Sequence, residues 1–154
     1  MNNQNDKRTP KEEIKQLLFV CYGNICRSPM AEGLANHIPG GTVKAESAGI
    51  GAVPGSAAKE AVAALKKKYN IDISAHRARH VRDVKLDLFD FIIAMDPMVY
   101  SRLKEAGLAP ASKLFEWNIE DPVGTPVWVF EKIAEKIQDR LENFLTNREV
   151  RLSF

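Results

Sequence analysis

Short apolar stretches alternate with amphipathic ones along the interior of the chain. Four stretches predict β-strands, at residues 17–20, 43–47, 89–95 and 113–117. The first and third are apolar almost throughout, which is typical of parallel strands buried on both faces. The stretches between the strands carry apolar side chains three and four residues apart, which is the spacing of a helix that buries one face.

Small polar residues mark the predicted helix beginnings, and three of them precede proline. Such a residue caps the free N–H groups of the first turn, and proline fits the first helical position. The predicted caps are Ser28, Ser56, Asp96 and Thr125. The helix after Thr125 is predicted to be the longest. Its predicted buried stripe comprises Phe130, Ile133, Ile137, Leu141 and Phe144.

The alternation of strands and helices predicts an α/β fold, a three-layer sandwich in which a four-stranded parallel sheet has helices on both faces. With 154 residues, the chain is expected to form one domain. We place this domain at residues 14–147, between a disordered tail of residues 1–13 and a short tail of residues 148–154. Ligands of such folds bind at the carboxyl ends of the strands, so the segment after the first strand is the first candidate site.

Composition narrows the functional classes. The net charge of +2 is too small for a nucleic-acid footprint. No apolar run approaches the roughly 20 residues that are needed to cross a membrane. The polar segment Met1–Glu13 lacks the apolar core of a signal peptide. We therefore expect a cytoplasmic protein that binds neither nucleic acid nor a membrane.

The two cysteines, Cys21 and Cys26, are too few for a disulfide framework or for a four-thiolate zinc site. The three histidines, His37, His76 and His80, are scattered without the spacing of metal ligands. No metal or cofactor is expected. Both cysteines lie in the segment that follows the first predicted strand.

The segment from Cys21 to Ser28 joins a predicted strand to a predicted helix N-terminus. A short loop there turns backbone N–H groups toward a common centre, to which the helix dipole adds partial positive charge. Gly23 and Asn24 tolerate the left-handed conformations that such a loop needs. Arg27 offers a planar guanidinium that fits two phosphate oxygens. Because this field favours a thiolate, Cys21 is predicted to be a nucleophile that faces a bound phosphorus atom.

The run from Val20 to Glu32, VCYGNICRSPMAE, resembles the signature of the low-molecular-weight protein tyrosine phosphatases. Further motifs agree with that family in order and spacing over residues 15–145. They are Ser47-Ala48-Gly49, His76-Arg77-Ala78-Arg79, Phe89–Asp96 and Asp121-Pro122. The resemblance implies a flavodoxin-like sheet, the phosphotyrosine phosphatase I fold, and hydrolysis of protein tyrosine phosphate without a cofactor.

The resemblance also implies roles for individual residues. Cys21 attacks phosphorus to form a cysteinyl phosphate, and Asp121 acts first as general acid and then as general base. Glu120 is the neighbouring alternative for that acid. The loop holds a phosphate ion or the phosphoryl group of a phosphorylated protein substrate. The implied phosphate-binding residues are Tyr22, Gly23, Asn24, Ile25, Cys26, Arg27 and Ser28.

Asn24, Ser28, Ser47 and His76 resemble the residues that support the loop in this family, with Ser28 donating a hydrogen bond to the thiolate. Cys26 has two interpretations. Oxidation joins it to Cys21 in a protective disulfide, as the resemblance implies, or Cys26 only packs beneath the loop. We expect a monomer or a weak dimer.

The chain departs from the family at the mouth of the site. Members that act on phosphotyrosine often carry aromatic residues after the Ser-Ala-Gly motif and after the Asp-Pro motif. This chain has Val53 and Val123-Gly124 at these places. Tyr22, together with Trp117 or Trp128, is the candidate source of the missing aromatic surface.

Three alternative functions stay open. Protein-arginine phosphatases resemble the same family but tend to carry Thr where this chain has Ile25, so Ile25 favours phosphotyrosine. Arsenate reductases share the loop but need a further cysteine pair, and the chain has none after Cys26. A non-catalytic flavodoxin-like module would bind a phosphate-bearing ligand and would need neither Cys21 nor Asp121.

Overall fold

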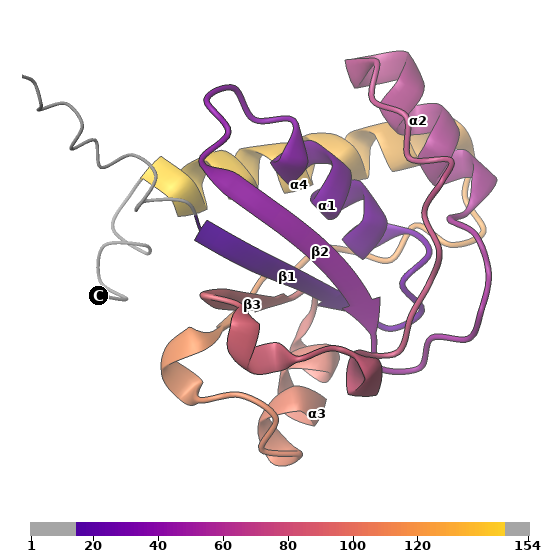
Figure 1. Cartoon of the computed structure of the whole chain (residues 1–154). Coiled ribbons are helices and arrows are strands. Elements are labelled where there is room, and N and C mark those ends of the chain that lie inside the picture. The colour runs from indigo at the N-terminus through magenta and orange to yellow at the C-terminus, as the bar shows by residue number, and fades with distance from the viewer. Residues whose placement is uncertain (1–14, 147–154) are drawn as a thin grey trace, which may run out of the picture.

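A four-stranded parallel sheet forms the middle layer of the computed structural model, which describes residues 15–146 (Figure 1). The strands are β1 (Lys15–Cys21), β2 (Val43–Gly49), β3 (Phe91–Ala94) and β4 (Leu114–Glu116). Their order in the sheet is β2-β1-β3-β4, and all neighbours are parallel. The predicted sheet is confirmed. The predicted tails, and the residues that bound the predicted domain, lie outside the described residues.

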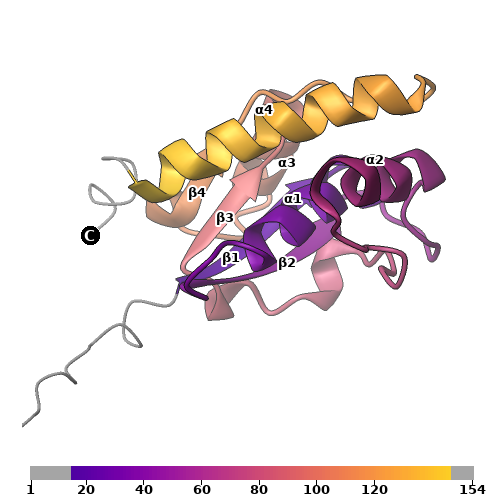
Figure 2. The same ribbon diagram turned by 90° about the horizontal axis from the view of Figure 1, so that it is seen from above.

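Helices cover both faces of the sheet, as predicted. Seen in the two views, α1 (Arg27–Asn36), α2 (Lys59–Tyr69) and α4 (Val127–Thr146) lie on one side, and α3 (Pro97–Glu105) lies on the other (Figures 1 and 2). Short 3-10 turns complete the chain. They are η2 (Val81–Asp83), η3 (Leu86–Leu88) and η4 (Ala111–Lys113). Within residues 15–146, no helix is long and apolar enough to cross a membrane.

Alternating side chains of β1 build two separate cores. Leu17 and Phe19 are fully buried in the larger core, together with the stripe of α4 that was predicted from the sequence. Leu18 and Val20 are fully buried in the smaller core with residues of α3. A strand whose two faces are both covered must be apolar throughout, which is why 17–20 is a continuous apolar run.

Two of the four predicted helix caps are wrong. Ser28 lies inside α1, which begins at Arg27 and has no side-chain cap. Ala58 precedes α2, and Ser56 instead forms an isolated β-bridge with Arg77. The Ser28 hydroxyl instead bonds to Cys21 and Asn24 of its own loop, and Ser56 pairs with the distant Arg77. These contacts outweigh the local capping preference.

The cap at Asp96 is confirmed, because its Oδ1 accepts a hydrogen bond from the backbone N–H of Val99 at 2.8 Å. Thr125 precedes α4, and its hydroxyl donates to the carbonyl oxygen of Pro122. The chain leaves β1 toward β2 on one side and later returns to β3 on the other. The carboxyl end of β1 is therefore the point where the connections diverge, the usual ligand position in such sheets.

Candidate active site

A small hollow of about 130 Å³ opens at the carboxyl end of β1. Its lining residues come from the loop after β1 and from the loop before α4. They are Cys21, Tyr22, Gly23, Ile25, Cys26, Arg27, Asp121 and Val123. The hollow has the scale of a phosphoryl group rather than of a large cofactor. It brings together all three predicted catalytic residues and most of the predicted phosphate-binding loop.

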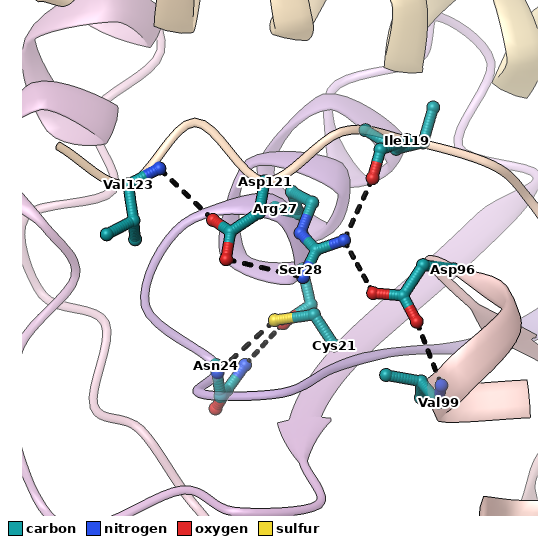
Figure 3. A network of polar contacts seen from close by, with 9 residues as sticks. All are labelled: Cys21, Asn24, Arg27, Ser28, Asp96, Val99, Ile119, Asp121 and Val123. Atoms are coloured by element: carbon teal, nitrogen blue, oxygen red, sulfur yellow. Dashed lines mark hydrogen bonds and ion pairs between the residues drawn. The ribbon is translucent and has the colours of Figure 1, made fainter. Parts of the chain in front are cut away.

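Cys21 ends β1 with its Sγ held by two polar groups. The backbone N–H of Asn24 donates to Sγ at 3.2 Å, and the hydroxyl oxygen of Ser28 lies 3.0 Å from Sγ (Figure 3). Both partners are fully buried. Donors that converge on sulfur favour its ionised form, so the geometry suits a nucleophilic thiolate.

Asn24 connects the nucleophile to β2 through its side-chain amide. Its Nδ2 donates to Ser28 Oγ at 2.8 Å and to Ser47 Oγ at 2.9 Å. Because Ser28 Oγ already accepts from Asn24, its own proton is available to Cys21. Ser47 in turn donates to Glu32 Oε1 at 2.6 Å. The Asn24 amide thus donates to the Ser28 hydroxyl, and that hydroxyl donates to the sulfur of Cys21.

The backbone of Asn24 is left-handed, with a φ of 59°, which asparagine adopts more readily than most residues. Two groups from the segment after α2 hold this conformation. His76 Nε2 donates to the Asn24 carbonyl oxygen at 2.8 Å, and the backbone N–H of Arg79 donates to Asn24 Oδ1 at 3.0 Å. The structure thus brings Asn24, Ser28, Ser47 and His76 together. Arg79, whose Nε also donates to the Ser47 carbonyl oxygen, is an addition to them.

Gly49 explains the last position of the Ser-Ala-Gly motif. A Cβ atom there would lie 2.5 Å from the carbonyl oxygen of Tyr22 and 3.0 Å from the backbone nitrogen of Asn24. The loop after β1 therefore passes so close to the end of β2 that only glycine fits.

Arg27 is buried and its guanidinium is fixed before any ligand binds. Its Nη1 donates to Asp96 Oδ2 and to the carbonyl oxygen of Ile119, both at 2.8 Å (Figure 3). Its Nη2 lies 3.9 Å from Asp121 Oδ2. The sequence marked Asp96 as a helix cap and as the end of the Phe89–Asp96 motif, and did not assign it to the site. Its position directly after the third strand, beside β1, was the signal that could have placed it at the site.

Asp121 lies at the open side of the hollow, with 53% of its side chain exposed. Its Oδ1 accepts a hydrogen bond from the backbone N–H of Val123 at 3.1 Å. The neighbouring Glu120 does not line the hollow. It binds Lys136 Nζ at 2.6 Å, and that hydrogen bond lowers the pKa of Glu120. The geometry therefore favours Asp121 as the general acid.

Comparison with known proteins assigns most of the chain to one protein family. Residues 16–152 match the family described as low molecular weight phosphotyrosine protein phosphatase. The chain belongs to this family. A probable low molecular weight protein-tyrosine-phosphatase, EpsP of Ralstonia nicotianae, is 36% identical over 132 residues, which cover 81% of this chain and 90% of that protein.

Solved structures of the phosphatase family have the same fold. The low molecular weight protein tyrosine phosphatase from T. tengcongensis superimposes with a TM-score of 0.80 at 38% identity, covering 85% of this chain and 97% of that one. The YwlE arginine phosphatase from Geobacillus stearothermophilus superimposes with a TM-score of 0.72 at 29% identity, covering 87% of this chain and 98% of that one.

Another relative found by sequence has a different described activity. A glutaredoxin arsenate reductase from Synechocystis is 29% identical over 136 residues, which cover 86% of this chain and 97% of that protein.

Cys26 is the second thiol of this family member's loop. It is buried, and burial raises its pKa from 9.0 to about 12, with a further upward contribution from the nearby Asp121 carboxylate. Cys21 and Cys26 are both free thiols. Both line the hollow, so the structure brings the predicted redox pair into one site.

The mouth of this phosphatase-family site differs from one prediction. Trp117 is only 1% exposed and packs against Phe19 and Phe144 in the core, so it cannot contact a substrate. Trp128 is exposed but does not line the hollow. Tyr22 does line it, with 49% of the residue exposed.

Among residues 15–146, no three His, Cys, Asp or Glu side chains cluster as metal ligands would.

Proposed function

We propose that this phosphatase-family protein hydrolyses tyrosine phosphate in proteins through a cysteinyl-phosphate intermediate. The observation that carries the proposal is the position of the Cys21 sulfur. It accepts a hydrogen bond from a backbone N–H, lies beside a serine hydroxyl, and lines one small hollow with Arg27 and Asp121. Cys21 is thus the nucleophile, Arg27 binds the phosphoryl oxygens and Asp121 is the acid. A two-step phosphoryl transfer requires these three parts.

In the first step the Cys21 thiolate attacks phosphorus, forming an S–P bond as the P–O bond to the leaving group breaks. Asp121 gives its proton to the leaving oxygen, which departs as a neutral phenol. Arg27 and the loop N–H groups bind the equatorial oxygens, whose charge is redistributed in the transition state. The pairing of Arg27 with Asp96 means that the guanidinium does not have to be reoriented during the reaction.

In the second step water attacks the cysteinyl phosphate. Asp121, now a carboxylate, removes a proton from that water, and the S–P bond breaks to release phosphate and the Cys21 thiolate. Asp121 therefore ends the cycle protonated, as it began, and no proton is gained or lost by the enzyme. The Ser28 hydroxyl, which donates a hydrogen bond to Cys21 Sγ, stabilises the sulfur as a leaving group in this step.

Arginine phosphatase activity is the second candidate. It is supported by the likeness to the YwlE arginine phosphatase over most of the chain. Ile25 lines the hollow, and this larger side chain in place of threonine favours phosphotyrosine over phosphoarginine. Arsenate reduction is disfavoured because the sequence has only two cysteines, and both are in this loop. A binding module without catalysis would leave the placement of Cys21 and Asp121 unexplained.

Hydrolysis of a phosphotyrosine peptide tests the proposal. The wild type is expected to turn over the peptide, and Cys21→Ser is expected to be inactive while still binding inorganic phosphate by calorimetry. Phosphoarginine and phosphoserine peptides, assayed side by side, decide the substrate. Faster turnover of phosphoarginine would replace the first proposal by the second. Equal inactivity of wild type and Cys21→Ser, with phosphate bound by both, would indicate a binding module.

The setting of this activity is also part of the proposal. We propose that the domain comprises residues 14–147 and acts in the cytoplasm as a monomer or a weak dimer. Cell fractionation checks the location, and sedimentation velocity over a hundredfold range of concentration checks the assembly. A variant limited to residues 14–147 is expected to keep the activity of the full chain.

A further inference from the structure

Tyr22 stands at the rim of the hollow, directly after the nucleophile in the sequence. About half of the residue is exposed. It lines the same hollow as Asp121 and Val123, which belong to the loop on the open side. The leaving group of a substrate must pass between these residues, because Cys21 takes the phosphorus and Asp121 protonates the leaving oxygen.

Gly51 provides the surface on which the Tyr22 ring lies. A Cβ atom on Gly51 would be 2.5 Å from Tyr22 Cζ and 2.8 Å from both Cε2 and the hydroxyl oxygen. The backbone N–H of Gly51 also donates to the carbonyl oxygen of Tyr22 at 2.9 Å. The ring and the backbone of Tyr22 are therefore both held against this one glycine.

The need for glycine at position 51 comes from the ring and not from the backbone. Gly51 is absent from the glycines with positive φ, which are Gly40, Gly41, Gly107 and Gly124. The φ of Gly51 lies outside the region that favours glycine, and the three atoms nearest to an added Cβ all belong to the tyrosine side chain. The absence of a side chain at position 51 thus leaves room for the Tyr22 ring at the mouth of the hollow.

We infer that Tyr22, seated on Gly51, is a specificity-determining residue that forms the aromatic wall for the leaving group of the substrate. This inference rests on the proposed function and names the substrate class as an aryl phosphate. A ring fixed in advance loses little freedom on binding, and it offers a face or edge to a second ring. Val123 supplies an apolar side chain in the same lining.

Equilibrium binding of two phosphonates, which are not hydrolysed, tests the contact between the Tyr22 ring and the ring of a ligand. Phenylphosphonate carries the ring and methylphosphonate does not, so the ratio of their dissociation constants isolates the contact with the ring. We expect Tyr22→Leu to reduce the preference for phenylphosphonate by about 2–10-fold, from the usual strength of an aromatic pair. Tyr22→Phe is expected to keep the preference, because it keeps the ring.

Gly51→Ala is expected to lower the preference as Tyr22→Leu does, because the added methyl group displaces the ring. The double variant is expected to lose no more than Tyr22→Leu alone, since both changes remove one contact. Gly55→Ala is the matched control, because a Cβ there meets nothing within 4 Å. It is expected to leave both dissociation constants unchanged.

An unchanged ratio in Tyr22→Leu, with methylphosphonate still bound, would overturn the inference. Equal weakening of both phosphonates in Gly51→Ala would also overturn it, since the glycine would then support the loop and not the ring. The proposed function fails by a different result, namely absence of Cys21-dependent hydrolysis. A lowered ratio in the absence of hydrolysis would support the aromatic wall in a binding site alone.

Discussion

Arg27 Nη1 and Asp96 Oδ2 lie 2.8 Å apart and join the loop after β1 to the end of β3, 69 residues further along the chain. The same carboxylate uses its other oxygen to cap α3 through the backbone N–H of Val99. Asp96 thus fixes the guanidinium and the first turn of a helix at once. A clamp held in this way is oriented before the substrate arrives, which is the condition for strong electrostatic stabilisation.

Asp96→Asn tests this coupling, because asparagine can still cap α3 but no longer carries the charge that holds Arg27. We expect kcat to fall by about 10–100-fold, the scale of a misplaced catalytic group, with a small change in thermal stability. Steady-state kinetics and a thermal melt measure the two effects. Asp87→Asn, at an acidic residue in η3 away from the hollow, is the control. Equal kinetics in wild type and Asp96→Asn would show that Arg27 is held by the Ile119 carbonyl oxygen alone.

Asp121→Asn removes the proposed acid while keeping the side-chain shape. We expect kcat for phosphotyrosine to fall by about 10²–10⁴-fold, the usual contribution of general acid–base catalysis. The loss should be smaller for an aryl phosphate with a better leaving group. The wild type is expected to show a bell-shaped pH profile, since the proposed mechanism needs a thiolate nucleophile and a protonated acid at the same time. Asp121→Asn is expected to lose the alkaline limb of that profile.

Glu120→Gln is the matched comparison for that experiment. Glu120 binds Lys136 and does not line the hollow, so its loss is expected to leave kcat and the pH profile unchanged. If Glu120→Gln lost the alkaline limb and Asp121→Asn kept it, the two acidic residues would have to exchange roles.

Gly49→Ala is expected to damage the loop itself. Its Cβ would lie 2.5 Å from one backbone atom and 3.0 Å from another, and neither can be relieved by rotating a side chain. The loop or β2 must therefore move, at a cost of about 1–3 kcal/mol in the free energy of unfolding. Affinity for inorganic phosphate should fall together with the midpoint of thermal unfolding. Gly55→Ala, which adds the same methyl group in open space, should change neither.

The parts of the site that are local in sequence could be predicted from it. The loop from Cys21 to Arg27 follows a strand and precedes a helix, and its physics depends on adjacent residues. The contacts of Arg27 with Asp96 and Ile119 span 69 and 92 residues, and nothing in a local pattern indicates them. They depend on β3 pairing with β1, so they become visible only once the strand order is known.

Two wrong predictions have the same physical origin. Ser28 before a proline is a good helix cap in isolation, but in the fold its hydroxyl meets Cys21 and Asn24 instead. Trp117, two residues from the Ile119 carbonyl that binds Arg27, was a candidate for the mouth. Its ring instead faces the core, because burying so large an apolar surface outweighs any local preference for the rim.

Cys26 gives a prediction about the pH dependence of oxidation. If peroxide converts Cys21 to a sulfenic acid, Cys26 displaces water to form the disulfide, and only its thiolate is the attacking species. Because burial raises the pKa of Cys26 to about 12, the thiolate fraction stays small near neutral pH. That fraction rises about tenfold for each pH unit below the pKa, so disulfide formation from the sulfenic acid should accelerate steeply between pH 7 and 9.

The rate is measured by oxidising the protein with a brief pulse of peroxide and following disulfide formation by mass spectrometry after trapping free thiols. Recovery of activity by added thiol should be high at pH 9 and lower at pH 7, where over-oxidation of Cys21 competes. Cys26→Ser should show poor recovery at both pH values. A rate of disulfide formation that does not change with pH would contradict a buried, high-pKa Cys26, and equal recovery in Cys26→Ser would leave Cys26 as a packing residue beneath the loop.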